Sequence, residues 1–284
     1  MKLERIEHPL ASQRVKGEGA LDVRLGVGRT RVERLYQQGA AKIRLPERDG
    51  DPLEAVLINT AGGLTGGDRL SWRLSVADGA SAVFTTQACE KVYRSAGGHA
   101  EQRTTIRAGD GSRIAWMPQE TILFDRADLR RSLDIELGAG ATALVAESVI
   151  FGRRSMGEAG RLAAYRDRWR IRSGGRLLHA EDFAISGDVA QLLERRAIAH
   201  GGGAMATVLL LGPDAGGSLD AARGIIGDAG SASAWTTSGF DADFGAGKLL
   251  ARLVAADGYA LRRRLVPLLE LLNGRAGLPK VWSL

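Results

Sequence analysis

Cysteine is nearly absent from this sequence of 284 residues, which has Cys89 as its single one. A lone cysteine excludes an internal disulfide framework and suits a reducing compartment. The sequence also lacks any apolar run of about 18 residues, the length that a membrane-spanning helix requires. Charged residues stand in the N-terminal stretch MKLERIEHPL, where a secretory signal peptide would carry its apolar segment. We therefore expect a cytoplasmic protein without a membrane span.

The residue patterns of the common catalytic sites are also missing. No G-x-S-x-G sequence is present, and the histidines are scattered without a partner motif at positions 8, 99, 179 and 200. A zinc site would need cysteine and histidine clustered at short spacing, and no such cluster occurs. The sequence predicts no nucleophile with its base and no tightly bound metal or other cofactor, so we do not expect an enzyme.

Glycine, by contrast, is abundant, with 38 residues, while proline contributes only 7. Glycine at this level without a collagen period indicates many tight turns, as in a β-rich chain. The formal net charge is +6 and the isoelectric point about 9.8. This charge favours an acidic partner, and nucleic acid, an acidic protein and an anionic membrane all satisfy that condition.

A strand, a glycine turn and a second strand recur along the sequence about every 30 residues. The turn and second strand fall at residues 78–87, 110–119, 139–148 and 173–182, each after an alternating apolar run. This repetition predicts a mainly β protein with layered or coiled sheets, although a plain series of hairpins fits the same pattern. Two helices are expected in the C-terminal third, at 218–230 and 258–274, with Pro267 bending or restarting the second. Residues 247–257 suit either a strand or a short helix. No linker is visible, so we expect a single domain over residues 1–284.

Polar residues close each of the four repeated units. If the units stack, the residues at these strand ends lie near one another: Gln87, Gln119, Glu120, Glu147, Glu181 and Asp182. Such a row of carboxylates and amides would offer oxygen ligands to a passing divalent cation. The simpler interpretation is that strand ends are polar because they lead into loops.

The glycine-rich stretch LINTAGGLTGGDRL, residues 57–70, does not match a phosphate-binding loop. A P-loop has lysine and a hydroxyl residue after its last glycine, whereas Asp68 and Arg69 follow Gly67 here. The carboxylate of Asp68 would repel phosphate. We expect a turn formed by Gly62, Gly63, Gly66 and Gly67 that holds Asp68 between two strands.

The stretch YRDRWRIR, residues 165–172, alternates arginine with other residues. In a strand, one face then carries four guanidinium groups, from Arg166, Arg168, Arg170 and Arg172, and Trp169 lies on the opposite face. A single-stranded nucleic-acid site needs aromatic and basic residues on one face, so an acidic protein partner fits better. A solvated edge strand protected by its charges remains an equal alternative.

Five segments in the same order resemble the urease accessory protein family UreD, called UreH in some bacteria. They are TAGGLTGGDRL, TTQACEKVYRS, WMPQETILFDRADLRRS, ESVIFGRRSMGE and LPKVW. The resemblance covers nearly the whole chain. It implies a mostly β protein without enzymatic activity that acts in urease maturation.

The resemblance also implies partners and a metal cargo. Family members bind apo-urease, recruit the accessory protein UreF and through it the GTPase UreG, and assist nickel delivery, in one model through an internal acidic channel. On that model Asp68 and Glu181 match channel carboxylates, and the stacked strand ends add Glu120 and Glu147. Nickel would be bound transiently, and nucleic acid would not be a partner. The alternative function is a basic β-rich nucleic-acid-binding protein.

Overall fold

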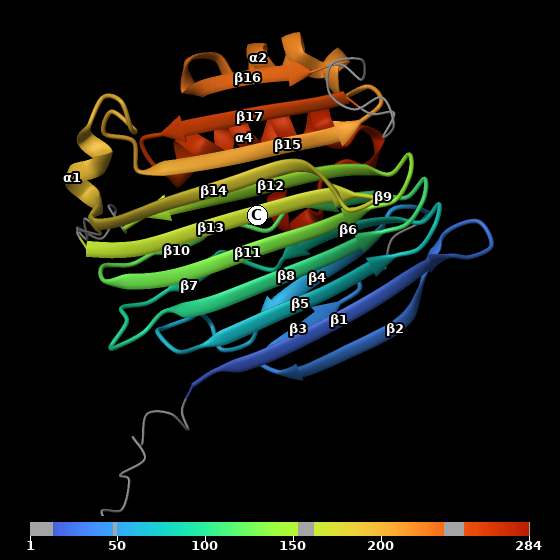
Figure 1. Ribbon diagram of the computed structural model, residues 1–284, viewed down its shortest axis with the longest axis horizontal. Helices are drawn as coiled ribbons and strands as arrows, with labels where there is room; N and C mark the ends of the chain where they lie inside the picture. The colour runs from blue at the N-terminus through green and yellow to red at the C-terminus, as the bar shows by residue number, and fades with distance from the viewer. Residues whose placement is uncertain (1–13, 48–49, 153–161, 236–246, 284) are drawn as a thin grey trace, which may run out of the picture.

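The computed structural model describes residues 14–47, 50–152, 162–235 and 247–283. Within these ranges the strands form a seven-stranded and a ten-stranded sheet, which lie face to face (Figure 1). The smaller sheet has the order β14 (Arg176–Asp188), β13 (Leu162–Ser173), β11 (Ala127–Leu137), β8 (Ala100–Ala108), β5 (Arg69–Val76), β1 (Lys16–Leu25) and β2 (Thr30–Gly39). The mainly β prediction is confirmed.

The larger sheet runs behind the smaller one and extends beyond it. Its order is β16 (Gly230–Trp235), β17 (Gly247–Ala255), β15 (Ala204–Gly212), β12 (Thr142–Phe151), β9 (Arg113–Trp116), β6 (Ser81–Thr86), β4 (Leu53–Asn59) and β3 (Ala41–Arg44). Two short strands, β10 (Thr121–Leu123) and β7 (Glu90–Val92), pair beside β12. Residues 247–255 are therefore a strand rather than a helix.

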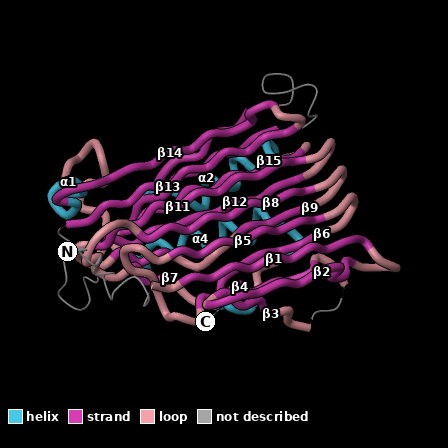
Figure 2. Tube along the Cα trace, turned by 60° about the horizontal axis from the view of Figure 1, so that its bottom comes forward, coloured by secondary structure: helices cyan, strands magenta, loops and turns pink. Residues whose placement is uncertain are grey.

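The repeated units coil from one sheet to the other. β5, β8 and β11 pair in parallel in the smaller sheet, while the strands that follow them, β6, β9 and β12, pair in parallel in the larger one. Turns stack at the end where the chain changes sheet (Figure 2). Asp110 donates its backbone N–H to Asp78 Oδ1 at 2.9 Å and accepts from the N–H of Ala139 through its own Oδ1 at 2.8 Å. This is the coiled alternative, a β-solenoid.

The fourth unit departs from the coil. β13 and β14 form an antiparallel hairpin within the smaller sheet, joined by Gly174 and Gly175. Both glycines have positive φ, 53° and 77°, which the tightest hairpin turns require. Because β14 stays in the smaller sheet, the expectation that Glu181 and Asp182 stack on the earlier strand ends is wrong.

Two helices cover the outer face of the larger sheet. They are α2 (Leu219–Ile226) and α4 (Gly258–Asn273), where the sequence predicted them. Pro267 does not interrupt α4; Pro267 and Arg263, whose carbonyl loses its helical partner, are both exposed. A shorter helix, α1 (Val189–Glu194), was not predicted. Short 3-10 turns are η3 (Ala215–Ser218), η4 (Gly227–Ala229), η5 (Gly274–Ala276) and η6 (Lys280–Ser283).

Two apolar cores result from these layers. The first lies between the sheets and contains three fully buried tryptophans, Trp72, Trp116 and Trp169. The second lies between the larger sheet and the helices, with Met117, Leu144 and Leu265 among its members. No helix in the described ranges has the length and apolarity to cross a membrane.

Candidate functional site: a polar row between the sheets

Glu147 points into the space between the two sheets. It lies within β12, not at its end as predicted, on the same face as Val145 and Val149 of the first core. Its side chain is 3% exposed, and Oε1 accepts a hydrogen bond from Trp116 Nε1 at 2.8 Å. Burial raises the pKa of Glu147 above its usual value, although the Arg131 guanidinium counteracts this effect.

Arg131 of β11 faces Glu147 from the opposite sheet. Its guanidinium donates to both oxygens of Asp167, at 3.0 and 2.7 Å, and to Glu147 Oε2. It also donates to Thr121 Oγ1 and to the hydroxyl of Tyr165. Burial alone would lower the pKa of Arg131, but the two carboxylates raise it well above its usual value. One cation thus neutralises two acids in the core. Removing any one of the three would leave a buried charge without its partner.

Glu181 lies at the edge of the same interior space. It pairs in register with the buried Trp169, so its side chain points inward from β14. Arg252 of β17 donates to both of its oxygens, at 3.3 and 2.7 Å. The two side chains differ in exposure, at 11% for Glu181 and 51% for Arg252. This pair stands where the interior meets solvent.

The buried cluster and the edge pair are connected through Thr207. Glu147 pairs with Thr207 across β12 and β15, and Thr207 pairs with Arg252 across β15 and β17. Residues paired across neighbouring strands project from the same face of the sheet. We call the resulting line of side chains the polar row: Asp167, Arg131, Glu147, Thr207, Arg252 and Glu181. It brings together two of the four predicted carboxylates.

Glu120 lies beside this row but faces the helices. It follows β9 and receives two hydrogen bonds from Arg262 Nη1 of α4, at 3.0 and 3.1 Å. Cys89 Sγ is 3.3 Å from Glu120 Oε2. Burial, together with the charge of Glu120, raises the pKa of Cys89 to about 12, so the thiol stays protonated and is a poor metal ligand.

Asp68 is held by the backbone. Its Oδ1 accepts from the N–H of Val15 at 2.9 Å and its Oδ2 from the N–H of Thr65 at 2.8 Å. The residue is 2% exposed and lies apart from the polar row. Both carboxylate oxygens therefore serve to close the glycine loop. This contact places Asp68 between two strands, as the sequence predicts.

The four glycines of this loop meet different requirements. Gly62 and Gly67 have φ of 75° and 90°, which side chains rarely adopt. A Cβ on Gly66 would lie 2.5 Å from the carbonyl oxygen of Gly97, and one on Gly63 would lie 2.6 Å from that of Lys91. Gly62 and Gly67 are needed for backbone conformation and Gly66 for the close approach of a neighbouring segment. Gly63, with φ of 154°, meets both requirements.

The arginines of β13 project outward as predicted, and Trp169 is buried on the other face. Strand β13 lies between β11 and β14, so it is not an edge strand. Arg166 and Arg170 share Asp182, and Arg168 and Arg172 share Asp134. This face is cationic, but each guanidinium already has an acid within 4 Å.

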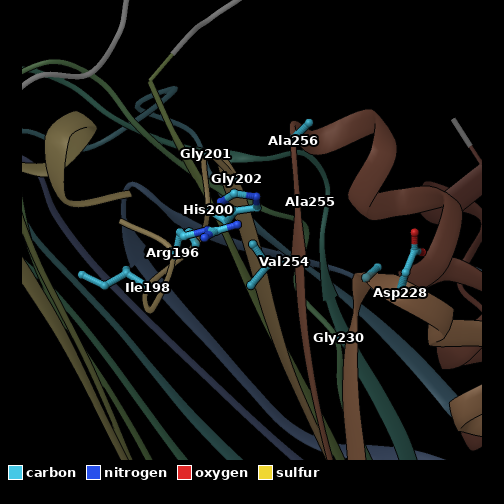
Figure 3. Close-up of a pocket in the computed structure, with 12 residues that line it drawn as sticks. Arg196, Ile198, His200, Gly201, Gly202, Asp228, Gly230, Val254, Ala255 and Ala256 are labelled. Carbon is cyan, nitrogen blue, oxygen red and sulfur yellow. The ribbon is translucent and has the colours of Figure 1, made fainter. Parts of the chain in front are cut away.

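A pocket of about 420 Å³ is lined by Arg196, His200, Asp228 and Val254, between the segment before β15 and the start of β16 (Figure 3). None of the predicted carboxylates lines this pocket. No group of three or more His, Cys, Asp or Glu side chains within the described ranges is arranged to hold a metal ion. The predicted carboxylates are thus paired with arginines or backbone N–H groups.

The partners of these carboxylates were missed at the level of sequence. Arg131 stands in LRRSLDIEL at a position where Leu129, Leu133 and Ile135 set an apolar phase. Asp167 interrupts the buried face of β13 in the same way. A charge in the apolar phase of a strand was the available signal, because such a charge requires a buried partner.

Fold and site together define a coiled β protein with paired buried charges and, in the described residues, no metal-holding cluster. The chain belongs to the UreD urease accessory protein family, whose model matches residues 15–283. It is 57% identical over 276 residues to urease accessory protein UreD of Mesorhizobium japonicum, covering 97% of this chain and 96% of that protein. It is 55% identical over 275 residues to UreD 1 of Brucella melitensis biotype 1, with the same coverage. The resemblance and the non-enzymatic class are confirmed.

Proposed function

We propose that this protein is a cytoplasmic scaffold for urease maturation. In this proposal it acts as one unit that binds apo-urease together with UreF and UreG and assists nickel delivery to the urease active site. The observation that carries the proposal is the family match over residues 15–283. The absence of a strong metal-binding cluster in the described residues is compatible with a passing cargo, since a complete histidine or cysteine site would retain nickel.

We further propose that the polar row forms part of the nickel path. Glu181 stands at the solvent edge and Glu147 inside, and Glu120 lies next to Thr121, which contacts the same Arg131. Carboxylate oxygens bind a divalent cation weakly when only one or two are available. For Asp68 we propose a supporting role, in which it fixes the glycine loop, because both of its oxygens are engaged by backbone N–H groups.

For the partner surface we propose the outer face of β13. There four guanidinium groups share two carboxylates, which leaves an excess of positive charge on an exposed sheet. Such a surface suits an acidic protein partner, and its contribution should appear mainly in the association rate and its salt dependence.

A co-purification experiment tests the scaffold and the path separately. The untagged chain is expressed with apo-urease subunits, UreF and UreG, and the nickel content of urease is then measured. We expect a complex with the unmodified chain, and Glu181→Gln should leave that complex intact while lowering urease nickel. Glu33→Gln, a solvent-exposed change of the same kind, is the control and should affect neither quantity.

Two outcomes would oppose these proposals. Failure of the unmodified chain to co-purify with any of the partners would overturn the scaffold. Full nickel loading with both Glu181→Gln and Glu147→Gln would overturn the carboxylate path while leaving the scaffold in place.

A further inference from the structure

His179 has an unusual environment for a histidine. It lies on β14 with its side chain 5% exposed, and its Nε2 atom has no hydrogen-bond partner. Most buried polar atoms in proteins are hydrogen-bonded, so an orphan nitrogen calls for an explanation. The ring of Trp169 packs against it in a T-shaped contact, with ring centroids 6.2 Å apart. This contact fixes the imidazole but leaves Nε2 unused.

The carboxylate of Glu181 is the acid nearest to this nitrogen. Glu181 follows two residues later on the same face of β14, and its Oε2 lies 4.0 Å from His179 Nε2. Lys248, Arg252 and Arg170 lie close enough to His179 to influence its charge. Burial and then these three charges lower the pKa of His179 to about 4, so the imidazole is neutral at physiological pH. At 4.0 Å the two atoms are too far apart for a hydrogen bond, and a neutral imidazole nitrogen is a common metal ligand.

The spacing suits a single metal ion between the two atoms. Bonds from a metal to imidazole nitrogen and carboxylate oxygen are each about 2.1 Å long, so two such bonds span at most about 4.2 Å. One ion can therefore contact both atoms without movement of the strand. Imidazole and carboxylate together suit first-row divalent ions, nickel among them.

Arg252 binds the Glu181 carboxylate in the structure. Its guanidinium binds both oxygens of Glu181, and half of its side chain is exposed. Because its side chain is half exposed, the guanidinium can exchange the carboxylate for water. We infer that His179 and Glu181 form a two-ligand site for a divalent transition-metal ion, and that Arg252 takes the place of the ion when the site is empty.

The neighbouring cations explain why such a site would be weak. Arg252 competes for Glu181, and Lys248 opposes a further positive charge nearby. A site of this kind binds and releases an ion readily, as a route of transit requires. The identity of the ion as nickel rests on the proposed function, whereas the ligand pair and the role of Arg252 rest on the geometry alone.

Nickel titration of the isolated, untagged protein tests the inference. Equilibrium dialysis with nickel chloride measures binding to the unmodified chain and to Arg252→Gln, which should bind at least about tenfold more tightly because a competitor and a repelling charge are gone. The matched control is Arg73→Gln. Arg73 of β5 is similarly exposed, at 56%, and pairs with the carboxylate of Glu18. Its removal should change binding by less than about threefold.

Two double variants identify the ligands. Arg252→Gln with His179→Leu, and Arg252→Gln with Glu181→Gln, should both lose the gain in affinity. If His179→Leu does not fold, as judged by its circular dichroism, the Glu181→Gln pair decides. In NMR spectra, paramagnetic nickel should broaden the ring signals of His179 before those of His99 and His200. Arg252→Gln binding no tighter than Arg73→Gln, or a gain that survives Glu181→Gln, would overturn the inference.

The result also separates this inference from the proposed function. Tighter nickel binding by Arg252→Gln with unchanged urease nickel content would support the site and remove it from the delivery path. Normal co-purification with urease, but without any effect of Arg252→Gln on nickel affinity, would sink the inference and leave the scaffold role intact.

Discussion

Arg131 and Arg252 both bind carboxylates of the polar row, but Arg131 is buried and Arg252 is half exposed. Arg131 is 4% exposed and donates to Asp167, Glu147, Tyr165 and Thr121. Arg252 is 51% exposed, and the contact described for it is with the Glu181 carboxylate. Burial decides what each pair contributes: the inner arginine cannot leave without stranding two acids, and the outer one can exchange its partner for water. An acid held by the first is part of the core, and an acid held by the second is available to a ligand.

The largest effect is expected from Arg131→Met. The substitution leaves Glu147 and Asp167 buried together without a cation, which should lower the free energy of unfolding by about 3–5 kcal/mol. Urea unfolding at pH 7 measures this. Adding Glu147→Gln and Asp167→Asn removes the stranded charges and should recover much of the loss. A loss below about 1 kcal/mol for Arg131→Met alone would contradict the contrast between inner and outer arginines.

Asp68→Ala should cause the next largest loss of stability, because backbone N–H groups, and not an arginine, bind this carboxylate. The change leaves the N–H groups of Val15 and Thr65 without their acceptor. Hydrogen bonds to a charged group contribute about 1.5–3 kcal/mol each, so we expect a loss of about 3 kcal/mol. Asp68→Asn keeps one acceptor oxygen and should lose about half as much. Equal stability of Asp68→Ala and the unmodified chain in urea would show that the loop does not depend on this carboxylate.

Glu90 extends the comparison to an acid without a cation, since no arginine or lysine in the described chain pairs with it. Burial raises its pKa to about 7, although a hydrogen bond from Asn59 Nδ2 counteracts this. The folded state therefore binds more protons than the unfolded state between about pH 4.5 and 7. Stability from this group is present below pH 4.5 and is lost as the pH rises toward 7. Glu90→Gln should remove this slope, which amounts to about 2–3 kcal/mol over that window because each pKa unit corresponds to about 1.4 kcal/mol.

Unfolding curves at pH 5 and pH 7 measure the effect of Glu90→Gln relative to the unmodified chain. Glu33→Gln is the control, since Glu33 is exposed on β2. An identical pH slope for Glu90→Gln and the unmodified chain would show that Glu90 titrates as it does in water.

Arg252→Ala should have the smallest effect on stability, within about 1 kcal/mol, because the Arg252 side chain is half exposed and solvent screens its ion pair with Glu181. Thermal unfolding compares it directly with Arg131→Met. A loss of 2 kcal/mol or more, on the scale given for buried pairs, would place Arg252 with the structural arginines and remove the basis for an exchangeable carboxylate.

Much of the fold was predictable because strand alternation and glycine turns are local signals. The coil and the hairpin were harder to separate. The corner turns have a single glycine of positive φ, Gly79, Gly111 or Gly140, whereas Gly174 and Gly175 both have positive φ. Two consecutive glycines are a strong signal for a two-residue hairpin turn. The prediction that residues 173–182 form a further unit of the coil did not take this glycine pair into account.

The site was less predictable, because its pairs join distant segments. Glu147 and Arg131 are close in sequence, but their contact requires that β11 and β12 lie in opposite sheets. Glu181 and Arg252 are 71 residues apart and meet only after β15 and β17 extend the larger sheet. The carboxylates were visible as candidates, and what neutralises each of them depends on tertiary structure.

The C-terminal part of the described chain meets its middle at Glu120. Trp282 Nε1 donates to the carbonyl of Met117 at 3.2 Å, and Arg262 Nη2 donates to the carbonyl of Trp282 at 2.9 Å. The segment that completes this corner is made more than 160 residues after the strand that it covers. During synthesis the coil can therefore wind strand by strand, while the Glu120 corner stays open to water until Arg262 and Trp282 have left the ribosome.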